Sequence, residues 1–378
     1  MDALTTPLPK DWEVKTFRDI STINQGLQIP ISQRLKAPTE HAKFYITIQA
    51  LNNRKEFEYI KTYNESVVCH KDDILMTRTG NTGMVITNIE GVFHNNFFKI
   101  NFDRTLINKD FLVYFLSLEQ TQKTILKKAG TSTIPDLNHN DFYSLLIPLP
   151  PLNEQIAIAN ILSDVDHYLY SLDSLILKKE SVKKALSFEL LSQRKRLKGF
   201  NQNWQRVRLG DICEITTGSL DANEMVRYGK YRFYTCAKEY YFIDKYAFDT
   251  EAILISGNGA YVGYVHYYKG KFNAYQRTYV LDNFSEHIIF VKYFLTMFLQ
   301  SHIQTNRNEG NTPYIVMGTL KDFEILLPPL NEQIAIANIL SALDHEIISL
   351  KNKKRQFENI KKALNHDLMS AKIRVLKK

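Results

Sequence analysis

Two short turns rich in polar side chains, one in each half of the chain, carry the residues best suited to hold a ligand through hydrogen bonds. The first turn follows the apolar run Ile74–Thr77, and the second follows Ile253–Ile255. The candidate contact residues are Arg78, Thr79, Asn81 and Thr82 in the first turn, and Ser256, Asn258 and Tyr261 in the second. Glycines in both turns let the backbone approach a ligand closely. These side chains are therefore suited to recognising a ligand through hydrogen bonds.

A second pair of loops repeats later in each half. One runs from Gly130 to Pro135 and the other from Gly310 to Pro313. The candidates in these loops, with one further arginine, are Thr131, Ser132, Thr133, Asn311, Thr312 and Arg277. Each candidate has a plainer interpretation as a turn residue without a ligand, or, for Tyr261, as a core residue.

Motifs for catalysis are absent from the chain. Adenine methyltransferases carry an aromatic residue after a Pro-Pro pair, whereas Leu follows both Pro150-Pro151 and Pro328-Pro329. No Gly-x4-Gly-Lys-Ser/Thr phosphate-binding loop is present. The three cysteines are widely spaced, and the histidines form no metal-binding pattern with them. We therefore expect a non-catalytic chain without a metal, a disulfide or a cofactor of its own.

The elements that position these loops come from a duplication. The fifteen residues from Leu149 to Ser163 recur unchanged from Leu327 to Ser341. Each copy opens a charged segment whose apolar residues alternate by four and three, the seam of a coiled coil: Ile158, Leu162, Val165, Leu169, Leu172 and Ile176, then Ile336, Leu340, Leu343, Ile347 and Leu350, with Phe357, Leu364 and Leu368 further along. Two rods of about 60 Å are expected, with Asn153 as the first N-cap. The alternative is that each helix packs on its own globule.

The segments before each helix predict globules that mix strands and a helix. The predicted strands of the first are Phe44–Ile48, Glu58–Ile60, Ser66–Cys69, Ile74–Thr77, Gly83–Ile89, Phe97–Phe102 and Leu145–Ile147. Helical spacing follows between Asp110 and Lys128, and again at Val291–Leu299. We predict an α+β protein with α/β globules at 1–148 and 199–326 and helices at 149–198 and 327–378. Antiparallel pairing of the helices would give approximate two-fold symmetry and bring the chain ends together.

Bulk composition agrees with a globular protein that binds a polyanion. The chain has 378 residues, of which 44% are hydrophobic and 23% charged, and its formal net charge is +8. This excess suits nucleic acid, although many basic proteins bind none. The polar N-terminus and the short apolar run 288–299, interrupted by Lys292, predict a soluble cytoplasmic protein without a membrane partner.

Together, these features resemble the DNA-specificity subunit of type I restriction–modification systems. The resemblance rests on the doubled Leu-Pro-Pro-Leu-Asn-Glu-Gln helix entry, the Gly-Thr-Ser-Thr-Ile-Pro loop and the turn around Arg78, and it covers the whole chain. It implies two target recognition domains that read the halves of a bipartite, asymmetric site on double-stranded DNA. The polar residues of the four loops and Arg277 would then contact DNA. The second turn departs from the pattern, because Gly257 stands where the first has Arg78.

The resemblance also implies protein partners. Two methyltransferase subunits would carry S-adenosylmethionine, and restriction subunits would use ATP and Mg²⁺. We expect the unchanged helix entries to dock two copies of one partner, with Glu154, Gln155, Glu332 and Gln333 at an exposed rim. The alternatives are a coiled-coil scaffold whose globules bind proteins, and a nuclease with an unrecognised site.

Overall fold

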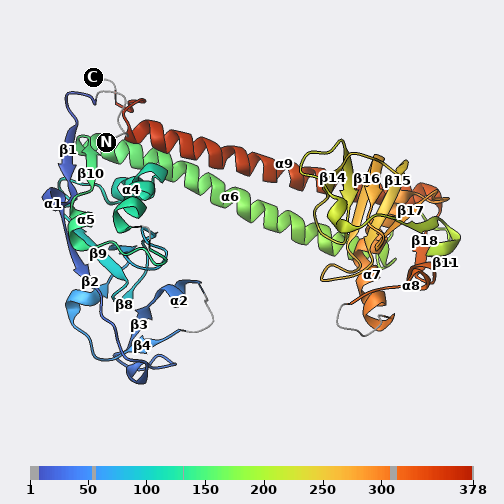
Figure 1. The fold of residues 1–378 in the computed structure, drawn as a ribbon, viewed down its shortest axis with the longest axis horizontal. Helices are drawn as coiled ribbons and strands as arrows, with labels where there is room; N and C mark the ends of the chain where they lie inside the picture. Colours follow the sequence, from blue (N-terminus) through green and yellow to red (C-terminus); the bar gives the residue numbers. More distant parts are fainter. Residues whose placement is uncertain (1–7, 53–56, 131, 307–312, 377–378) are drawn as a thin grey trace. The chain divides into compact units, whose positions relative to one another are not determined.

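The structure, a computed structural model, describes residues 8–52, 57–130, 132–306 and 313–376. The chain forms two compact units, and the division between them falls inside the two long helices. Unit 1 comprises Met1–Leu172 and Lys353–Lys378, and unit 2 comprises Asp173–Asn352. Each unit thus combines one globule with parts of both long helices (Figure 1).

Unit 1 contains two four-stranded sheets with the strand orders β2-β9-β6-β7 and β4-β3-β8-β5, and a separate antiparallel pair of β1 with β10. The strands are β1 (Glu13–Thr16), β2 (Ser21–Gln25), β3 (Lys43–Ile46), β4 (Tyr59–Ile60), β5 (Val68–Cys69), β6 (Ile74–Thr77), β7 (Val85–Ile86), β8 (Gly91–Phe93), β9 (Phe97–Phe102) and β10 (Leu146–Leu149). The predictions of β6 and β9 are confirmed at both ends, whereas β1, β2 and β8 were missed.

The unbroken apolar run of β6 is explained by two cores, one on each face of the strand. Side chains alternate across a strand. Ile74 and Met76 enter one core of unit 1, and Leu75 enters the other. Since both faces are covered, this strand shows no polar alternation. The turn that begins at Arg78 is therefore anchored on a fully buried strand.

Short helices complete unit 1: α1 (Phe17–Ile20), α2 (Ile48–Asn52), α3 (Lys109–Leu116), α4 (Glu119–Ala129) and α5 (His139–Tyr143). The single helix predicted between Asp110 and Lys128 is wrong in one respect, because it is two helices. The chain breaks at Ser117 and Leu118, where Gln122 Nε2 donates to the freed carbonyl of Leu116 at 2.7 Å. A side-chain amide thus satisfies a helix-end carbonyl at the break.

Unit 2 repeats the plan with the strands joined into one six-stranded sheet of order β12-β17-β15-β16-β13-β14, beside an antiparallel pair of β11 with β18. The strands are β11 (Gln205–Arg208), β12 (Glu214–Thr217), β13 (Tyr231–Tyr234), β14 (Tyr241–Ile243), β15 (Phe248–Ser256), β16 (Val265–Ala274), β17 (Thr278–Asp282) and β18 (Glu324–Leu327). The parallel pairing of β13 with β16 matches that of β3 with β8. Helices α7 (Ile288–Asn306) and α8 (Met317–Lys321) follow the sheet.

The long helices are α6 (Leu152–Leu191) and α9 (Leu330–Met369), and they pair antiparallel within each unit (Figure 1). In unit 1, Lys361 donates to Asp166 at 2.5 Å, and the rings of Tyr168 and Phe357 lie 4.6 Å apart. In unit 2, Lys179 donates to Glu346 at 2.9 Å, and Lys183 donates to Asp344. The predicted antiparallel pairing is confirmed in both units.

The first turns of these helices do not belong to the seam between them. Ile158 and Leu162 lie in a core of unit 1, and Ile336 and Leu340 lie in a core of unit 2. The alternative, that each helix packs on its own globule, is thus correct for the helix starts. Asn153 is not the N-cap, because α6 already begins at Leu152.

Candidate nucleic-acid interface

The first polar turn of unit 1 is held from inside by a buried threonine. Thr77 Oγ1 donates to the Asn81 carbonyl at 2.5 Å and accepts from Met84 N at 2.9 Å. Asn81 itself has a φ of 52°, in the left-handed region that asparagine tolerates better than most residues. Its side chain is exposed. The turn is therefore a fixed platform with Asn81 at its surface.

The structure joins this turn to the late loop through Asp136. Arg78 donates to Asp136 at 2.7 Å, Thr79 Oγ1 donates to the same carboxylate, and the guanidinium lies 5.6 Å from the centre of the Phe98 ring. Two predicted segments thus meet, although they lie more than fifty residues apart. The Arg78 side chain is only 18% exposed, so its orientation is set before any ligand binds.

Thr82 is not available for contact. It is 7% exposed, and its hydroxyl donates to the Pro135 carbonyl at 2.6 Å. The prediction of Thr82 as a contact residue is therefore wrong, and Thr82 is a structural residue that links the two loops. Ser132 and Thr133 are exposed, with Ser132 Oγ bonded to the Ile134 carbonyl at 2.7 Å. Thr131 lies outside the described residues.

In unit 2 the corresponding segments also meet. Gly259 N donates to the Pro313 carbonyl at 2.9 Å, and Asn258 forms a bridge with Tyr314. Tyr261 is 43% exposed, which removes its interpretation as a core residue, and Arg277 is exposed as well. Asn311 and Thr312 lie outside the described residues.

Ser256 is a second correction. Its side chain is fully buried, so it cannot reach a ligand at the surface. It ends β15 as Thr77 ends β6, and the chain position explains its burial. DNA contact by the exposed candidates of both units stays a prediction.

Gly257 shows why the arginine of the first turn has no counterpart in unit 2. A Cβ at this position would lie 2.3 Å from the Arg277 carbonyl oxygen and 2.9 Å from the Tyr279 ring. Tyr279 donates from its hydroxyl to the Ile315 carbonyl at 2.9 Å. The space that the Arg78 side chain takes beside Phe98 is closed here by backbone and a tyrosine, so the two units present different chemistry at matching positions.

The sequence analysis missed one further loop segment in each unit, which contains Gln28 in unit 1 and Asp221 in unit 2. In unit 1, Asn95 Nδ2 donates to Gln28 Oε1 at 3.4 Å, and in unit 2 Gln276 Nε2 donates to Asp221 Oδ1 at 2.8 Å. The repeated glycine before each segment was an available signal. A Cβ on Gly26 would lie 2.2 Å from the Phe93 carbonyl oxygen, and one on Gly218 would lie 1.9 Å from that of Ala274.

The four residues predicted at an exposed docking rim are buried, so that prediction is wrong. Their exposed fractions are 2% for Glu154, 0% for Gln155, 0% for Glu332 and 1% for Gln333. A buried carboxylate is stable only when it is paired and hydrogen-bonded. Each glutamate meets that need with partners distant in the sequence.

The two glutamates have equivalent partners. Glu154 accepts from Trp12 Nε1 at 3.1 Å and from Arg374 Nε at 2.7 Å. Arg374 also donates to Asp11 at 3.0 Å, which confirms that segments near the two chain ends lie together.

In unit 2, Glu332 accepts from Trp204 Nε1 at 3.1 Å and from Arg196 at 2.6 Å. Each arginine follows one long helix and binds the start of the other. The glutamate of each helix entry is therefore a structural residue, because it joins the start of one long helix to the segment that follows the other.

The glutamines next to them hold the globule. Gln155 Oε1 accepts from Asn108 N at 2.9 Å while its amide donates to the Pro150 carbonyl. Gln333 Oε1 likewise accepts from His287 N at 3.0 Å, and its amide donates to the Pro328 carbonyl. The glutamine thus ties the helix entry to the segment that precedes α3 in unit 1 and α7 in unit 2.

What the two helix entries do expose is a different face. Asn153, Ile156 and Asn160 are exposed in the first copy, and Asn331, Ile334 and Asn338 are exposed in the second. Spacings of three and four residues place each trio on one side of its helix. Both copies therefore show solvent the same asparagine–isoleucine–asparagine face.

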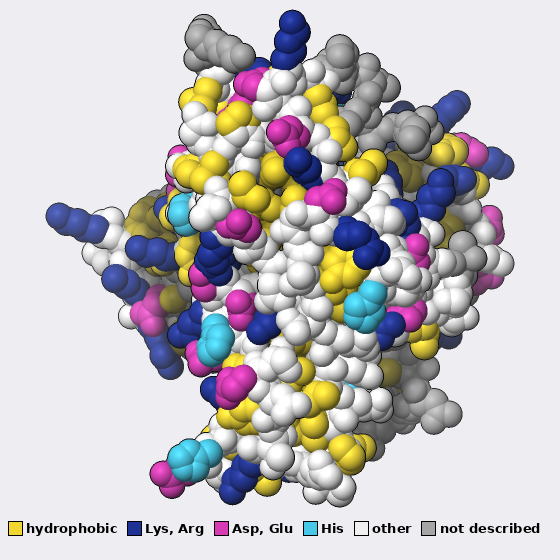
Figure 2. Space-filling model, turned by 90° about the vertical axis from the view of Figure 1, so that its left-hand side faces the viewer, with side chains coloured by type: hydrophobic (Ala, Val, Ile, Leu, Met, Phe, Trp, Pro, Cys, Tyr) yellow, Lys and Arg dark blue, Asp and Glu magenta, His cyan; other side chains and the backbone are white. Residues whose placement is uncertain are grey.

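Several lysines of the long helices form ion pairs within the protein. Lys179, Lys183 and Lys351 each pair with a carboxylate on the opposite helix. In unit 1, Lys99 donates to the Val68 carbonyl at 2.8 Å and Lys128 donates to Ser144 at 2.8 Å. Figure 2 shows one face of the molecule, on which basic and acidic side chains are interspersed.

Burial and hydrogen bonding shift the pKa values around the helix pair of unit 2. Burial opposes ionisation of Asp344, but hydrogen bonds from Lys183 and Tyr293 outweigh it and hold the pKa of this carboxyl below its ordinary value. Burial lowers the pKa of Lys292. The Tyr293 hydroxyl donates to Asp344 at 2.6 Å, and burial with this bond raises its pKa.

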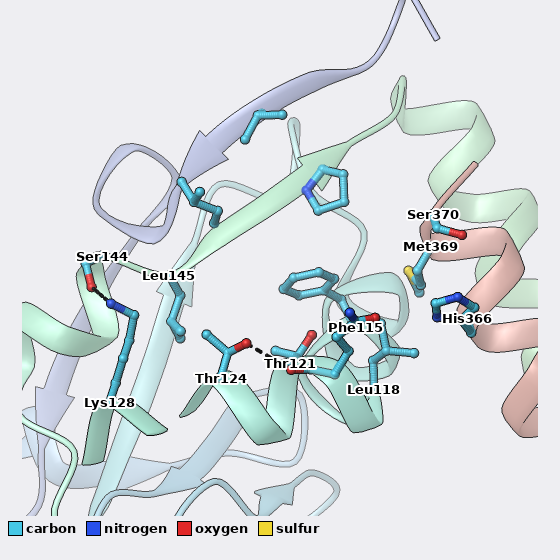
Figure 3. A pocket seen from close by; sticks show the side chains of 14 residues that line it. Phe115, Leu118, Thr121, Thr124, Lys128, Ser144, Leu145, His366, Met369 and Ser370 are labelled. Carbon is cyan, nitrogen blue, oxygen red and sulfur yellow. Dashed lines mark hydrogen bonds between the residues drawn. The ribbon is translucent and has the colours of Figure 1, made fainter. Parts of the chain in front are cut away.

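A surface cavity of about 410 Å³ lies in unit 1 away from the predicted contact residues. Figure 3 shows that its lining includes Phe115, Leu118 and Leu145 of the globule and Met369 of α9. No predicted site residue lines it. Within the described ranges, no cluster of histidine, cysteine and carboxylate side chains could hold a metal. No helix in the part of the chain that the structure describes combines the length and apolar character that crossing a membrane requires.

Comparison with known proteins gives a consistent result. A family model described as type I restriction modification DNA specificity domain matches residues 9–179 and 201–359. The type I restriction enzyme MjaVIII specificity subunit of Methanocaldococcus jannaschii is 25% identical over 415 residues, covering 97% of this chain and 94% of that protein. The EcoDI specificity subunit of Escherichia coli is 40% identical over 161 residues, covering 42% of this chain and 35% of that protein.

Solved structures share the fold. The crystal structure of a type I restriction–modification system S subunit from M. genitalium aligns with a TM-score of 0.64, 19% identity, and coverage of 96% of this chain and 98% of that one. At this level of identity the likeness establishes the fold alone.

Proposed function

This chain belongs to the family of type I restriction–modification DNA-specificity proteins, and we propose that it is the non-catalytic subunit that reads an asymmetric DNA sequence in two separated parts. Unit 1 binds one half-site and unit 2 binds the other. The observation that carries the proposal is the recurrence of one loop cluster in both units with different side chains at matching positions, as at Arg78 and Gly257. One fold with two sets of contact residues suits two different target sequences.

The residues proposed to read DNA match the hydrogen-bonding code of the major groove. Arginine can bind the O6 and N7 atoms of guanine, and asparagine can bind adenine at N6 and N7. Arg78 and Asn81 offer these groups in unit 1, and Asn258 and Arg277 offer them in unit 2. Exposed lysines of the two units set the register on phosphates.

The long helices set the distance between the half-sites. Each has 40 residues and runs without a break from one unit into the other, a length of about 60 Å. Half-sites on one side of the duplex recur about every 34 Å. The unread base pairs between them are thus measured by helix length.

We place partner docking on the exposed face of the helix entries. The partners are two methyltransferase subunits, which carry S-adenosylmethionine, with restriction subunits that use ATP and Mg²⁺, all in the cytoplasm. Ile156 is 41% exposed and Ile334 is 39% exposed, each between two asparagines. An exposed isoleucine repeated in the same polar setting is a basis for binding two copies of one protein.

Replacement of both isoleucines by a charged residue tests this docking. Ile156→Glu with Ile334→Glu should abolish co-purification of two methyltransferase subunits, and either change alone should leave one subunit bound. Ile348→Glu is the matched control, since Ile348 is 54% exposed on α9 outside the repeat. Full binding by the double variant would refute the assignment.

The function itself is tested by sequencing methylated adenines in cells that express the two partner subunits with or without this chain. We expect methylation at a bipartite motif that depends on the chain. Methylation that persists unchanged without the chain, or a motif with one continuous part, would contradict the proposal.

A further inference from the structure

One arginine of unit 2 lies over two tyrosine rings. The guanidinium carbon of Arg232, on β13, is 4.2 Å from the centre of the Tyr240 ring and 4.4 Å from that of Tyr268. Such stacking holds the plane of a guanidinium while leaving its N–H groups at the edge. Arg232 is half-buried, and Tyr240 is 41% exposed.

Arg232 lacks the acidic partner that several other arginines have. No carboxylate among the described residues lies within ion-pairing distance of it, and its hydrogen bond to Tyr234 Oη is long at 3.4 Å. By contrast, Arg34 of unit 1 also lies over a tyrosine but binds Glu58 at 2.9 Å. Arg206 of unit 2 binds Glu324 at 2.7 Å. An arginine with a fixed plane and unused donors is prepared for an external acceptor.

This arginine is continuous with the loop cluster of unit 2. The Tyr234 ring lies 5.2 Å from the ring of His266, which in turn lies 4.8 Å from the ring of Tyr264. Lys238 lies 5.1 Å above the ring of Tyr261, a predicted contact residue. A row of packed aromatic rings, with the buried Tyr234 in its middle, therefore connects the predicted turn to Arg232.

Unit 1 has no equivalent group. The parallel pairings Tyr45↔Val92 and Phe233↔Asn273 align β3 with β13, so that Phe44 takes the place of Arg232. The Phe44 ring packs against Phe57 at 5.5 Å and Tyr59 at 6.2 Å. Arg232 is thus another position at which the units differ.

We propose that Arg232 reads a guanine in the half-site bound by unit 2, with Tyr240 and Tyr268 as the residues that position it. The inference rests on the proposed function and adds a specificity-determining residue to it. Guanine recognition needs two donors in one plane opposite O6 and N7, and two tyrosine rings this close to the guanidinium restrain its plane. A phosphate contact requires only charge within reach and would not need a fixed plane.

The test compares methylation motifs in cells that carry the partner subunits with the full chain, unaltered or with Arg232→Ala or Arg232→Lys. Both variants should accept other bases at one guanine position in one half-site, with discrimination reduced by about 5-fold to 150-fold. The other half-site should not change. Lysine keeps the charge but loses the planar pair of donors, so it should not restore specificity.

Two further variants make the result unambiguous. Tyr240→Ala removes one stacking ring from an exposed position and should relax the same base position in part. Arg206→Ala removes an equal charge from unit 2 and should leave the motif unchanged.

A motif unchanged in all Arg232 and Tyr240 variants would overturn the inference while leaving the proposed function intact. Uniform weakening by alanine that lysine restores would make Arg232 a phosphate contact and also overturn it. If the unaltered chain directs no methylation, the proposed function itself fails.

Discussion

The guanidinium of Arg78 shares Asp136 with the Thr79 hydroxyl and lies over the Phe98 ring. Side chains held in this way lose little conformational freedom on binding. Orientation by a carboxylate also restricts which acceptor groups the arginine can meet. Because Gly257 excludes any side chain in unit 2, under the proposed function this chemistry serves one half-site only.

Replacement of Arg78 by alanine is expected to relax specificity in one half-site only, at a loss of about 1–3 kcal/mol in discrimination. The measurement is binding of the assembled complex to duplexes that vary at each position. Arg104→Ala, which removes an exposed arginine paired with Asp72 in the same unit, serves as the control. Equal weakening on every sequence would instead identify Arg78 as a phosphate contact.

Burial makes Glu332 more important for stability than exposed carboxylates. Glu332→Ala leaves Arg196 and the Trp204 N–H without their acceptor and should lower the free energy of unfolding of unit 2 by about 3 kcal/mol. Glu346→Ala, which breaks an exposed pair with Lys179, should cost about 1 kcal/mol or less. Urea titration followed by Trp204 fluorescence measures the loss of stability in both variants. Equal losses would contradict the structural role of the buried Glu332.

At the scale of elements, each long helix serves two purposes along its length. Its first turns complete the core of one globule, and its last turns enter the core of the other unit, as Leu190 and Leu191 do in unit 2. Between them lies the seam, which is reinforced by charged residues. The Tyr293–Asp344–Lys183 contacts of unit 2 recur in unit 1 as Tyr114, Asp166 and Lys361.

These contacts predict a pH dependence for unit 2. Because the pKa of Asp344 is lowered in the folded protein, its ionised form adds stability above the pKa of the unfolded state, about 4. That stability is lost as the pH falls below 4 and the folded carboxyl takes up a proton. Asp344→Asn should therefore reduce stability at pH 6 and flatten its decline between pH 5 and pH 3, measured by urea titration. An unchanged slope would refute this role.

At the scale of the molecule, α6 and α9 each continue across the division between the units, after Leu172 and after Asn352. Because the two helices are antiparallel and continuous at these points, length can be added to both there. A heptad keeps the seam in phase. The helix pair that is proposed to set the distance between the half-sites can thus be lengthened without altering either globule.

Insertion of seven residues after both Leu172 and Asn352 adds about 10.5 Å of helix. We expect methylation at a motif whose unread spacer is longer by about three base pairs. The same insertion in α6 alone leaves α9 too short and should destabilise the chain. Unchanged spacing in the doubly lengthened protein would exclude the helices as the ruler.

Local patterns in the chain were enough to establish the tandem plan, the paired helices, the strands β6 and β9, and the family. Repeats and periodicity can be seen within a few residues, and they report which faces need cover. They also identified turns whose surface residues, Asn81, Asn258 and Tyr261, are accessible. They did not reveal β1, β2 or β8, which are short and gain their stability from distant partners.

Only the tertiary structure decided which polar residues are free. Glu154 appears exposed in a helix pattern, but Trp12 and Arg374 cover it. Thr82 lies in a turn and Ser256 at the end of a strand before a turn, yet both are buried. Arg232, in contrast, lies within a strand and keeps unused donors. Burial of a side chain depends on residues far away in the sequence, and spacing along the chain carries no record of them.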